Sequence, residues 1–270
     1  MPAKPYDLPP DFADTETAQE APPHSVDADK ARDPASDVVR RSNRLTSGNA
    51  SFILLKAANP LLQYLIFAKG WGHSVYAVLG LSAATPHIGM LSPKQKLLVG
   101  AALLGAARQI FWSLYINESP LSPIDAAHIA VYDLVADSTN TLLSLTSSAW
   151  SLGPHQWIGS AAVLLGSAIE TISELQRKWF KAKIQNNGRV NDGGLWRWCR
   201  HPNYAGFLVW RAGYAAMTDN MWAFWNPGLH LCQFAVSAIP VLERFQQLKY
   251  TDDWARYTRA TPYKLIPYVW

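Results

Sequence analysis

The sequence predicts an all-α protein, a polytopic membrane bundle of six or seven transmembrane helices that ends in a helical hairpin. Three observations support this prediction. Apolar stretches of about 20 residues, the length that crosses a bilayer, follow one another from Ser51 to Val241. Basic residues concentrate between and after the last of these stretches, and the first 50 residues are polar throughout. A soluble helical bundle with buried tryptophans is the alternative.

The N-terminal segment, residues 1–50, is rich in Pro, Ala, Asp, Glu, Lys and Arg and has no aliphatic run. Such a segment buries too little apolar surface to offset the entropy lost on ordering, so we expect a disordered tail. It also lacks the apolar core of a signal peptide, and no cleaved targeting segment is expected. The chain then divides into this tail and an integral membrane domain, residues 51–270.

The candidate spans share length and apolar character, although several contain polar residues. They are Ser74 to Leu91, Leu97 to Ile116, His128 to Trp150, Trp157 to Ser173, Asn203 to Met217 and Met221 to Val241. Ser51 to Lys69 is a weaker candidate, because Lys56 and the Asn59-Pro60 pair interrupt it. If this segment lies in the interface, six spans remain and the N-terminal tail is cytosolic. If it crosses, there are seven.

Basic residues predict the orientation. The loop 177–200 carries seven Lys and Arg residues against one acid, Asp192, which indicates a cytosolic loop by the positive-inside rule. The segment after Val241 is also basic, so the C-terminus is expected on the same side. The residues between them then cross twice as a hairpin, whose turn we expect near Thr218-Asp219-Asn220.

Cys199 and Cys232 lie far apart in the chain and show no metal-ligand spacing. They support neither a disulfide framework nor a metal site.

Two groups of polar residues interrupt apolar stretches. The segment VYDLVADSTN places Asp133 and Asp137 on one helix face, beside Tyr132. These groups indicate either acid–base chemistry or helix packing through polar side chains. Glu170 and Glu174 lie one helical turn apart and predict either a cavity or partner, or a Glu174–Lys178 pair with interfacial anchoring.

The segment GLWRWCRHPNYAGFLVWR, residues 194–211, combines basic, amide and aromatic groups at the start of an apolar stretch. Pro202 suits the first turn of a helix, whose N-terminus together with Arg200, His201 and Asn203 forms a donor cluster for an anion or carboxamide. The alternative is an aromatic belt with snorkelling basic residues. Likewise, the basic loop before it suits either anionic headgroups or the phosphates of a nucleotide cofactor.

The blocks IETISELQRKWFK and GLWRWCRHPNYAG resemble the C-terminal domain of the steroid 5-alpha-reductase family, which is DUF1295-like. The wider membrane superfamily includes sterol reductases and isoprenylcysteine methyltransferases. The resemblance runs from about Ile158 to the C-terminus, so the signature region is 158–270. It implies a membrane-embedded, NADPH-dependent reductase of a C=C bond in a sterol or other lipid, in the endoplasmic reticulum membrane. Membrane lipids are the other expected partners, and no nucleic acid is expected.

The resemblance also implies site residues. A cationic, amide-lined groove holds NADPH, and an acid polarises the substrate. Tyr132 or Asp133 is the catalytic candidate, because the motif itself does not supply this acid. The residues implied to bind the cofactor are Glu170, Gln176, Lys181, Arg200, His201, Asn203, Tyr204 and Arg244.

One departure from the family's pattern leaves the reaction open. Family members usually carry an acid directly after the glycine of RHPNY-x-Gly, where this chain has Phe207. One alternative is an S-adenosylmethionine-dependent methyltransferase of the isoprenylcysteine type, whose late acid corresponds to Glu243. Another is a non-catalytic lipid-binding membrane protein.

Overall fold

The computed structural model describes residues 46–84, 89–118, 121–148 and 151–270, and regular structure within these ranges is entirely helical. This confirms the all-α prediction for that part of the chain. The predicted disordered tail lies outside the described residues up to position 45. The helices are α2 (Ser47–Ala68), α3 (Trp71–Val78), α4 (Pro93–Phe111), α5 (Pro123–Leu143), α6 (Pro154–Lys181), α7 (Pro202–Ala216), α8 (Trp225–Gln233) and α9 (Ile239–Ala260). π-Helical turns, Trp112–Ile116 and Phe234–Ala238, extend α4 and join α8 to α9.

Proline marks where several helices begin. The first residue of α4, α5, α6 and α7 is a proline, whose missing N–H has no partner to lose at that position. The hydroxyl oxygens of Ser92 and Ser122 then accept hydrogen bonds from the backbone N–H groups of Gln95 and Asp125. Local sequence therefore accounts for these boundaries.

Three helical segments are long and apolar enough to cross a membrane, namely Ser47–Ala68, Pro93–Ile116 and Pro154–Lys181. This agrees with an integral membrane protein. The predicted span Ser74 to Leu91 is wrong, because α3 ends at Val78 and the left-handed Gly80 (φ 70°) follows. Helix α2, which contains most of the weaker candidate Ser51 to Lys69, is instead one of the three segments that can cross.

The polar residues of α2 explain this reversal. Lys56 and Asn59 are buried against Asp133 and Asp137 of α5, where each finds a hydrogen-bonding partner. Pro60 is accommodated inside the helix. A hydropathy scale assigns each of these polar groups a high free energy of transfer into the membrane. That free energy is much lower when the group is paired inside a helix bundle.

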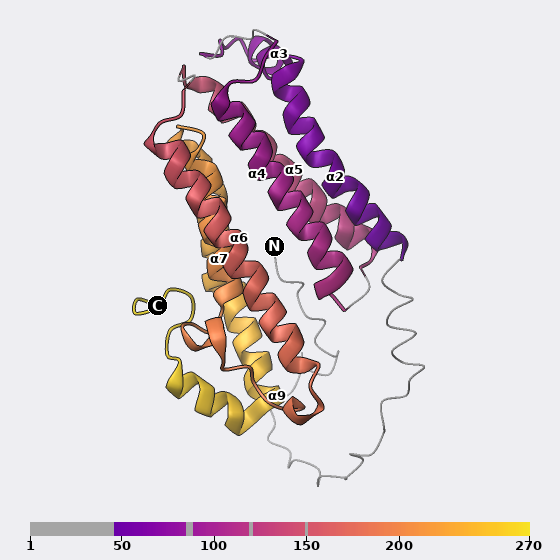
Figure 1. Cartoon of the computed structure of the whole chain (residues 1–270), viewed down its shortest axis with the longest axis vertical. Helices are drawn as coiled ribbons and strands as arrows, with labels where there is room; N and C mark the ends of the chain where they lie inside the picture. Colours follow the sequence, from indigo (N-terminus) through magenta and orange to yellow (C-terminus); the bar gives the residue numbers. More distant parts are fainter. Residues whose placement is uncertain (1–45, 85–88, 119–120, 149–150) are drawn as a thin grey trace.

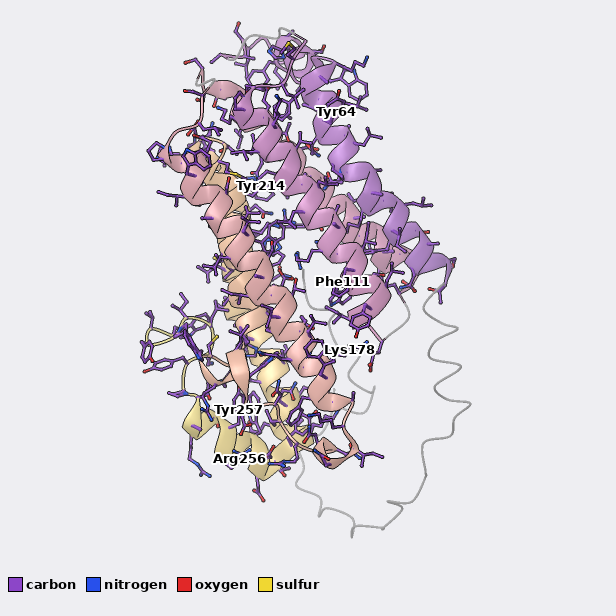
Figure 2. The ribbon with its side chains drawn as sticks, viewed as in Figure 1. Tyr64, Phe111, Lys178, Tyr214, Arg256 and Tyr257 are labelled. Carbon is purple, nitrogen blue, oxygen red and sulfur yellow. The ribbon has the colours of Figure 1, made fainter. Side chains whose placement is uncertain are left out.

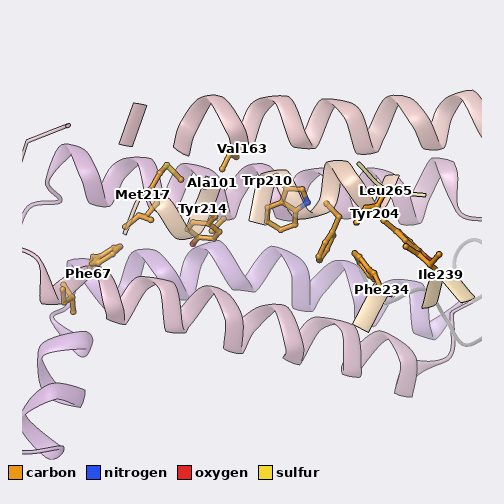
Figure 3. Close-up of a cluster of buried hydrophobic side chains, with 14 of the residues drawn as sticks. Phe67, Ala101, Val163, Tyr204, Trp210, Tyr214, Met217, Phe234, Ile239 and Leu265 are labelled. Carbon is orange, nitrogen blue, oxygen red and sulfur yellow. The ribbon is translucent and has the colours of Figure 1, made fainter. Parts of the chain in front are cut away.

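The helices form two groups. Figure 1 shows α2, α4 and α5 side by side, with α6 and α7 forming the other group, α3 at one end of the bundle and α9 at the other. The large cluster of buried apolar side chains lies between the groups (Figure 3). Members from α7 are Tyr204, Phe207, Trp210 and Tyr214, and Phe234 and Ile239 come from the later chain. Helix α7 is therefore central to the fold.

The segment after α7 folds back along it. Helix α7 ends at Ala216, and Asp219 takes a left-handed conformation (φ 59°) in the polar stretch where the sequence predicted a turn. Tyr204 of α7 stacks on Phe234. Phe207, which follows Tyr204 in the chain, contacts His230, which precedes Phe234. This reversed order of contacts shows that the two segments run in opposite directions.

Helices α6 and α7 meet at backbone contact through glycines. A Cβ atom on Gly206 would lie 2.5 Å from the backbone nitrogen of Glu170 and 2.7 Å from the Gly166 carbonyl oxygen. A Cβ atom on Gly213 would lie 2.6 Å from the Gly159 carbonyl oxygen. Such small-residue contacts are typical of membrane helix pairs. They place Glu170 of α6 directly against α7.

Substituting Gly206→Ala tests this crossing. The added methyl group must push the two backbones apart, so we expect a loss of stability of about 1–3 kcal/mol. Gly100→Ala in α4 is the matched control, because nothing lies within 4 Å of its Cβ position and alanine favours a helix over glycine by about 1 kcal/mol. Thermal unfolding in detergent should therefore shift in opposite directions for the two variants. Equal shifts would contradict the close crossing.

Candidate functional site

The signature residues Arg200 and His201 converge on one carboxylate, that of Glu243 in α9. Arg200 Nε donates to Glu243 Oε1 at 2.7 Å, and His201 Nε2 lies 3.4 Å from the same oxygen. Lys264 Nζ lies 3.3 Å from Glu243 Oε2. The side chains of Arg200 and His201 are buried, whereas that of Lys264 is 34% exposed. We call these four residues the Glu243 cluster.

Arg200 also holds the C-terminal segment. Its Nη1 donates to the carbonyl oxygens of Thr261 and Pro262, both at 3.2 Å, and its backbone N–H donates to the Tyr263 carbonyl. The backbone N–H of His201 donates to the Lys264 carbonyl. Arg200 therefore has a structural role besides its contact with Glu243.

The charge states of the Glu243 cluster follow from its contacts. Burial alone would raise the pKa of the Glu243 carboxyl, but the hydrogen bond from His201 and the charges of Arg200 and Lys264 outweigh it and lower the pKa to about 2. Burial lowers the pKa of His201, and Glu243 only partly opposes this effect. At neutral pH the cluster thus contains an ionised Glu243 and a neutral imidazole.

The next predicted residues connect α6 to the signature. Asn203 Nδ2 donates to Glu174 Oε1 at 2.8 Å, and Arg177 binds the other carboxylate oxygen. Gln176 Oε1 accepts from the backbone N–H of Leu195 at 3.0 Å and so anchors the 3-10 turn Gly194–Arg197.

The alternative Glu174–Lys178 pair does not form. Lys178 instead donates to the backbone carbonyl of Tyr115, beyond the end of α4. Figure 2 shows Lys178 on the part of α6 that faces this end of α4. Lys181 and Arg244, the other two residues implied to bind phosphates, are exposed.

A continuous row of aromatic rings leads inward from the signature. His201 stacks on Tyr204 (centroids 5.6 Å apart), and Tyr204 stacks on Phe234 (4.4 Å). Phe207 contacts both Phe234 (5.6 Å) and His230 (4.6 Å). We call these residues the aromatic row. Phe207, which replaces the family's usual acid, is only 1% exposed and lies in the middle of this row.

Tyr132 lies at the inner end of the row. Its ring meets His230 edge to face at 5.0 Å, and its hydroxyl accepts a hydrogen bond from Asn226 Nδ2 at 2.9 Å. His230 Nδ1 lies 3.0 Å from the backbone carbonyl oxygen of Asn226. The same Nδ1 lies 3.3 Å from the Tyr132 hydroxyl oxygen, so it either donates to the carbonyl or accepts from the hydroxyl, depending on the tautomer.

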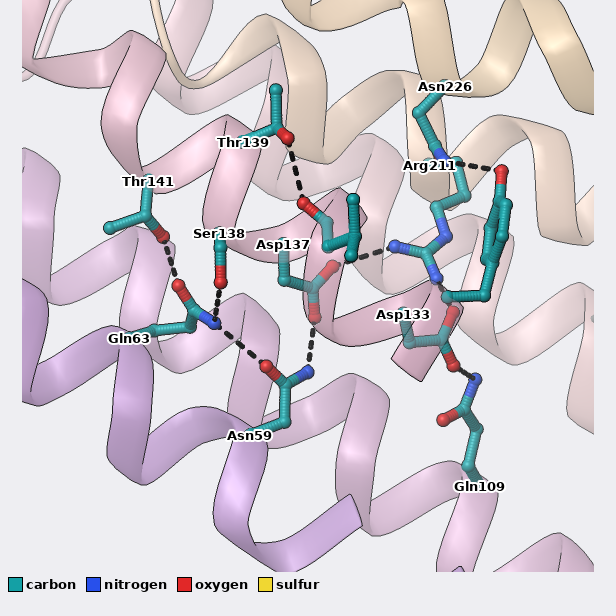
Figure 4. Close-up of polar contacts among 12 residues, drawn as sticks. Asn59, Gln63, Gln109, Asp133, Asp137, Ser138, Thr139, Thr141, Arg211 and Asn226 are labelled. Atoms are coloured by element: carbon teal, nitrogen blue, oxygen red, sulfur yellow. Dashed lines mark hydrogen bonds and ion pairs between the residues drawn. The ribbon is translucent and has the colours of Figure 1, made fainter. Parts of the chain in front are cut away.

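Asp133 lies in a buried network with Asp137 and Arg211 (Figure 4). Arg211 binds one Asp133 oxygen, while Lys56 and Gln109 bind the other. Arg211 Nη1 also donates to Asp137 at 2.7 Å, and Asn59 donates to the second Asp137 oxygen. The two carboxylates are thus matched by two cations, and each oxygen has a partner.

Glu170 belongs to a third group, shared by α4, α6 and α7. Its carboxylate accepts from Trp210 Nε1 at 2.8 Å and pairs with Arg108 Nη1 at 2.7 Å. The sequence patterns did not predict Arg108, Lys56 and Arg211 as site residues. Each is a lone basic residue within an apolar stretch, which is the signal that points to a buried partner.

Comparison with protein families matches residues 128–261 to a family described as "Protein of unknown function (DUF1295)". This is the C-terminal family of steroid 5-alpha-reductases, so the resemblance seen in the sequence is confirmed for this region.

Two curated proteins extend the comparison. The chain is 28% identical to "Probable O-methyltransferase ustE" of Ustilaginoidea virens, over 80% of this chain and 84% of that protein. It is 25% identical to Protein-S-isoprenylcysteine O-methyltransferase B of Arabidopsis thaliana, over 44% of this chain and 64% of that protein. The C-terminal half of the chain thus matches the DUF1295 family, and the chain is similar to two O-methyltransferases.

Proposed function

From this family match and the Glu243 cluster, we propose that the protein is a membrane-embedded methyltransferase that uses S-adenosylmethionine to methylate an oxygen atom of a lipid-soluble substrate. The observation that carries the proposal is the contact of Arg200 and His201 with Glu243. A dinucleotide needs cations that are free to bind its phosphates, whereas here the charge of Arg200 is matched by a carboxylate. The named activity of both relatives supports the same choice.

The residues of the Glu243 cluster fit the amino-acid end of S-adenosylmethionine, which carries an ammonium and a carboxylate. Such a zwitterion requires an anion and a cation close together, as Glu243 and Arg200 are. Lys264, at 3.3 Å from Glu243 and partly exposed, can turn away to admit the ammonium group. The aromatic row fits the rest of the molecule, because ring faces attract cations such as a sulfonium.

Within this proposal the chain's own residues bind, orient and exclude water. When bound, S-adenosylmethionine supplies a methyl group on a positively charged sulfur for transfer to a substrate oxygen. Tyr204, Phe207 and Phe234 are buried rings beside the Glu243 cluster, and they would favour that positive charge and keep water away. We assign the proton of His230 to Nδ1, the atom nearest the Asn226 carbonyl, so that Nε2 would accept the proton of a substrate hydroxyl.

The second candidate is the NADPH-dependent reductase of a sterol or other lipid C=C bond. The signature blocks favour it, and Gln176, which resembles the family's residue, anchors the turn before RHPNY. In this candidate Tyr132 or Asp133 polarises the substrate, and Lys181 and Arg244 bind phosphates from exposed positions. For either activity we propose that the Glu243 cluster faces the cytosol, in the endoplasmic reticulum membrane, with α5, α7 and the segment from Met221 to Val241 as further spans.

Calorimetric titration of the full chain in detergent with S-adenosylmethionine, NADPH and NADH distinguishes the candidates. We expect binding of S-adenosylmethionine alone. Preferential binding of NADPH would overturn the methyltransferase in favour of the reductase. Binding of none of the three ligands would favour a non-catalytic lipid-binding protein.

Phe207→Glu gives an independent test. A carboxylate inside the aromatic row interrupts the ring contacts and is buried without a partner, which is costly. We therefore expect the affinity for S-adenosylmethionine to fall about tenfold or more. Phe207→Leu keeps the site apolar and is the control, with a smaller loss expected. Melting temperatures identify any variant that fails to fold. NADPH binding gained by Phe207→Glu would instead indicate a reductase site.

A further inference from the structure

Arg108 has a guanidinium edge to which no described residue is hydrogen-bonded. The side chain is 7% exposed, and only Nη1 reaches an acceptor, Glu170 Oε1. The Nε and Nη2 atoms are buried, and neither has a hydrogen-bonding partner among the described residues. These two nitrogens lie along one edge of the planar guanidinium. Their N–H bonds point in the same direction, so both can donate to one oxygen group.

The surroundings of Arg108 hold this edge in place. Its guanidinium lies over the Trp210 ring, 5.2 Å from the centroid, while the same indole donates to Glu170. Arg211 packs on the same ring at 4.2 Å, and its buried Nε also lacks a partner among the described residues. The Arg108 guanidinium therefore sits where the two helix groups meet, against Trp210, whose ring also contacts Phe207 of the aromatic row.

A second feature of α4 lies next to Arg108. The π-helical turn Trp112–Ile116 begins four residues later. Such turns are rare and occur frequently at functional sites. Buried polar groups without partners are also rare in native proteins, and each calls for an explanation.

The charges nearby determine which ligand fits. The buried cations Arg108, Arg211 and Lys56 are already matched by three carboxylates, those of Glu170, Asp133 and Asp137. A further anion would leave one buried negative charge without a counterion, which is costly. A neutral acceptor uses the free N–H groups without disturbing this balance.

We propose that the Nε–Nη2 edge of Arg108 binds the carbonyl oxygen of an uncharged, lipid-soluble ligand, such as a ketone, lactone or ester. This site lies outside the Glu243 cluster and is independent of which cofactor the protein uses. The carbonyl fixes the orientation of an otherwise apolar ligand, because the hydrocarbon around it offers no directional contact. Apolar ligands of similar shape that lack a carbonyl bind less tightly, since they leave the guanidinium unpaired.

The test uses three probes of similar shape, namely xanthone, which has a ketone, xanthene, which lacks it, and xanthene-9-carboxylate. Each is titrated into the full chain in nanodiscs. We expect wild-type protein to bind xanthone at least tenfold more tightly than xanthene, and xanthene-9-carboxylate no more tightly than xanthone. Equal affinities for xanthone and xanthene would overturn the proposal. Tightest binding of the carboxylate would overturn the choice of a neutral ligand.

Arg108→Lys is the decisive variant, because a lysine keeps the pair with Glu170 but has no two-donor edge. We expect it to lose the preference for xanthone while keeping the wild-type melting temperature. Gly105→Ala is the matched control one turn earlier, since its Cβ would meet Trp210 at an ordinary 4.0 Å, and it should retain the preference. A preference that persists in Arg108→Lys would show that another group binds the ketone.

Two further measurements complete the test. The bound xanthone C=O stretch should move to lower frequency in wild type but not in Arg108→Lys. Nanodiscs of ether-linked lipids, which have no ester carbonyls, should bind xanthone more tightly than ester-lipid nanodiscs if bilayer lipids occupy the edge. Equal xanthone affinity in the ether-lipid and ester-lipid nanodiscs would show that the natural ligand of this edge is not a bilayer lipid. Because no cofactor is added, failure here leaves the methyltransferase proposal intact, and loss of S-adenosylmethionine binding leaves this site intact.

Discussion

Glu243→Gln should reduce S-adenosylmethionine binding at least tenfold and destabilise the protein by about 1.5–3 kcal/mol, the range for hydrogen bonds to charged groups. The amide keeps the size of the carboxylate but no longer compensates Arg200, which stays buried against the C-terminal segment. It also removes the anion that we assign to the ammonium of the cofactor. Calorimetry and thermal unfolding measure the two effects separately.

A pH series sharpens this prediction. The Glu243 pKa of about 2 lies below the ordinary value of a glutamate, so its stabilisation is complete above the unfolded-state pKa and disappears as pH falls toward 2. Wild type should therefore lose stability more steeply than Glu243→Gln over the acid range. Parallel curves would show that Glu243 does not carry the charge interaction.

Glu118→Gln is the matched control for Glu243→Gln. Glu118 is 58% exposed, and its nearest cation, Lys178, lies 3.9 Å away. An exposed pair at that distance contributes about 0–1 kcal/mol. The control should leave both cofactor binding and stability near wild type.

Arg211→Met should destabilise the bundle by about 3–5 kcal/mol, the cost of breaking a buried ion pair by removing one partner. Arg211 joins α7 to both carboxylates of α5, and its side chain is 1% exposed. The methionine leaves Lys56 as the one cation of the network, against two buried carboxylates. Thermal unfolding in detergent measures the loss.

A double variant separates charge balance from packing. Arg211→Met combined with Asp137→Asn returns the network to one cation and one carboxylate, so it should recover much of the stability that Arg211→Met loses. Arg259→Met, at an exposed position of α9, is the control and should remain near wild type. If the two losses simply add in the double variant, Arg211 acts through packing alone.

The helical class, the helix start at Pro202 and the signature were predicted from the sequence. These features are local. Hydropathy depends on composition within a window, and a proline after serine marks a helix start wherever the helix later packs. The RHPNY block was likewise recognised as a contiguous string, which the family match confirms.

Span prediction failed where polar residues find partners far away in the chain. Lys56 lowers the hydropathy of α2, and only its contact with Asp133, 77 residues later, explains why the helix is buried there. By contrast, Ser74 to Leu91 is apolar enough to attract a prediction, yet its helix stops at Val78. A window of sequence contains no information on such partners.

By itself, the sequence determined the helical class and a resemblance to the reductase and methyltransferase superfamily, together with the residues that carry this resemblance. Only the tertiary structure decided how those residues are paired. Glu243 neutralises Arg200 from 43 positions away, Phe207 lies within an aromatic row, and Arg108 has an edge between the helix groups that no described residue pairs. The physical reason is that charge compensation and desolvation depend on distances through space, which the order of residues along the chain does not specify.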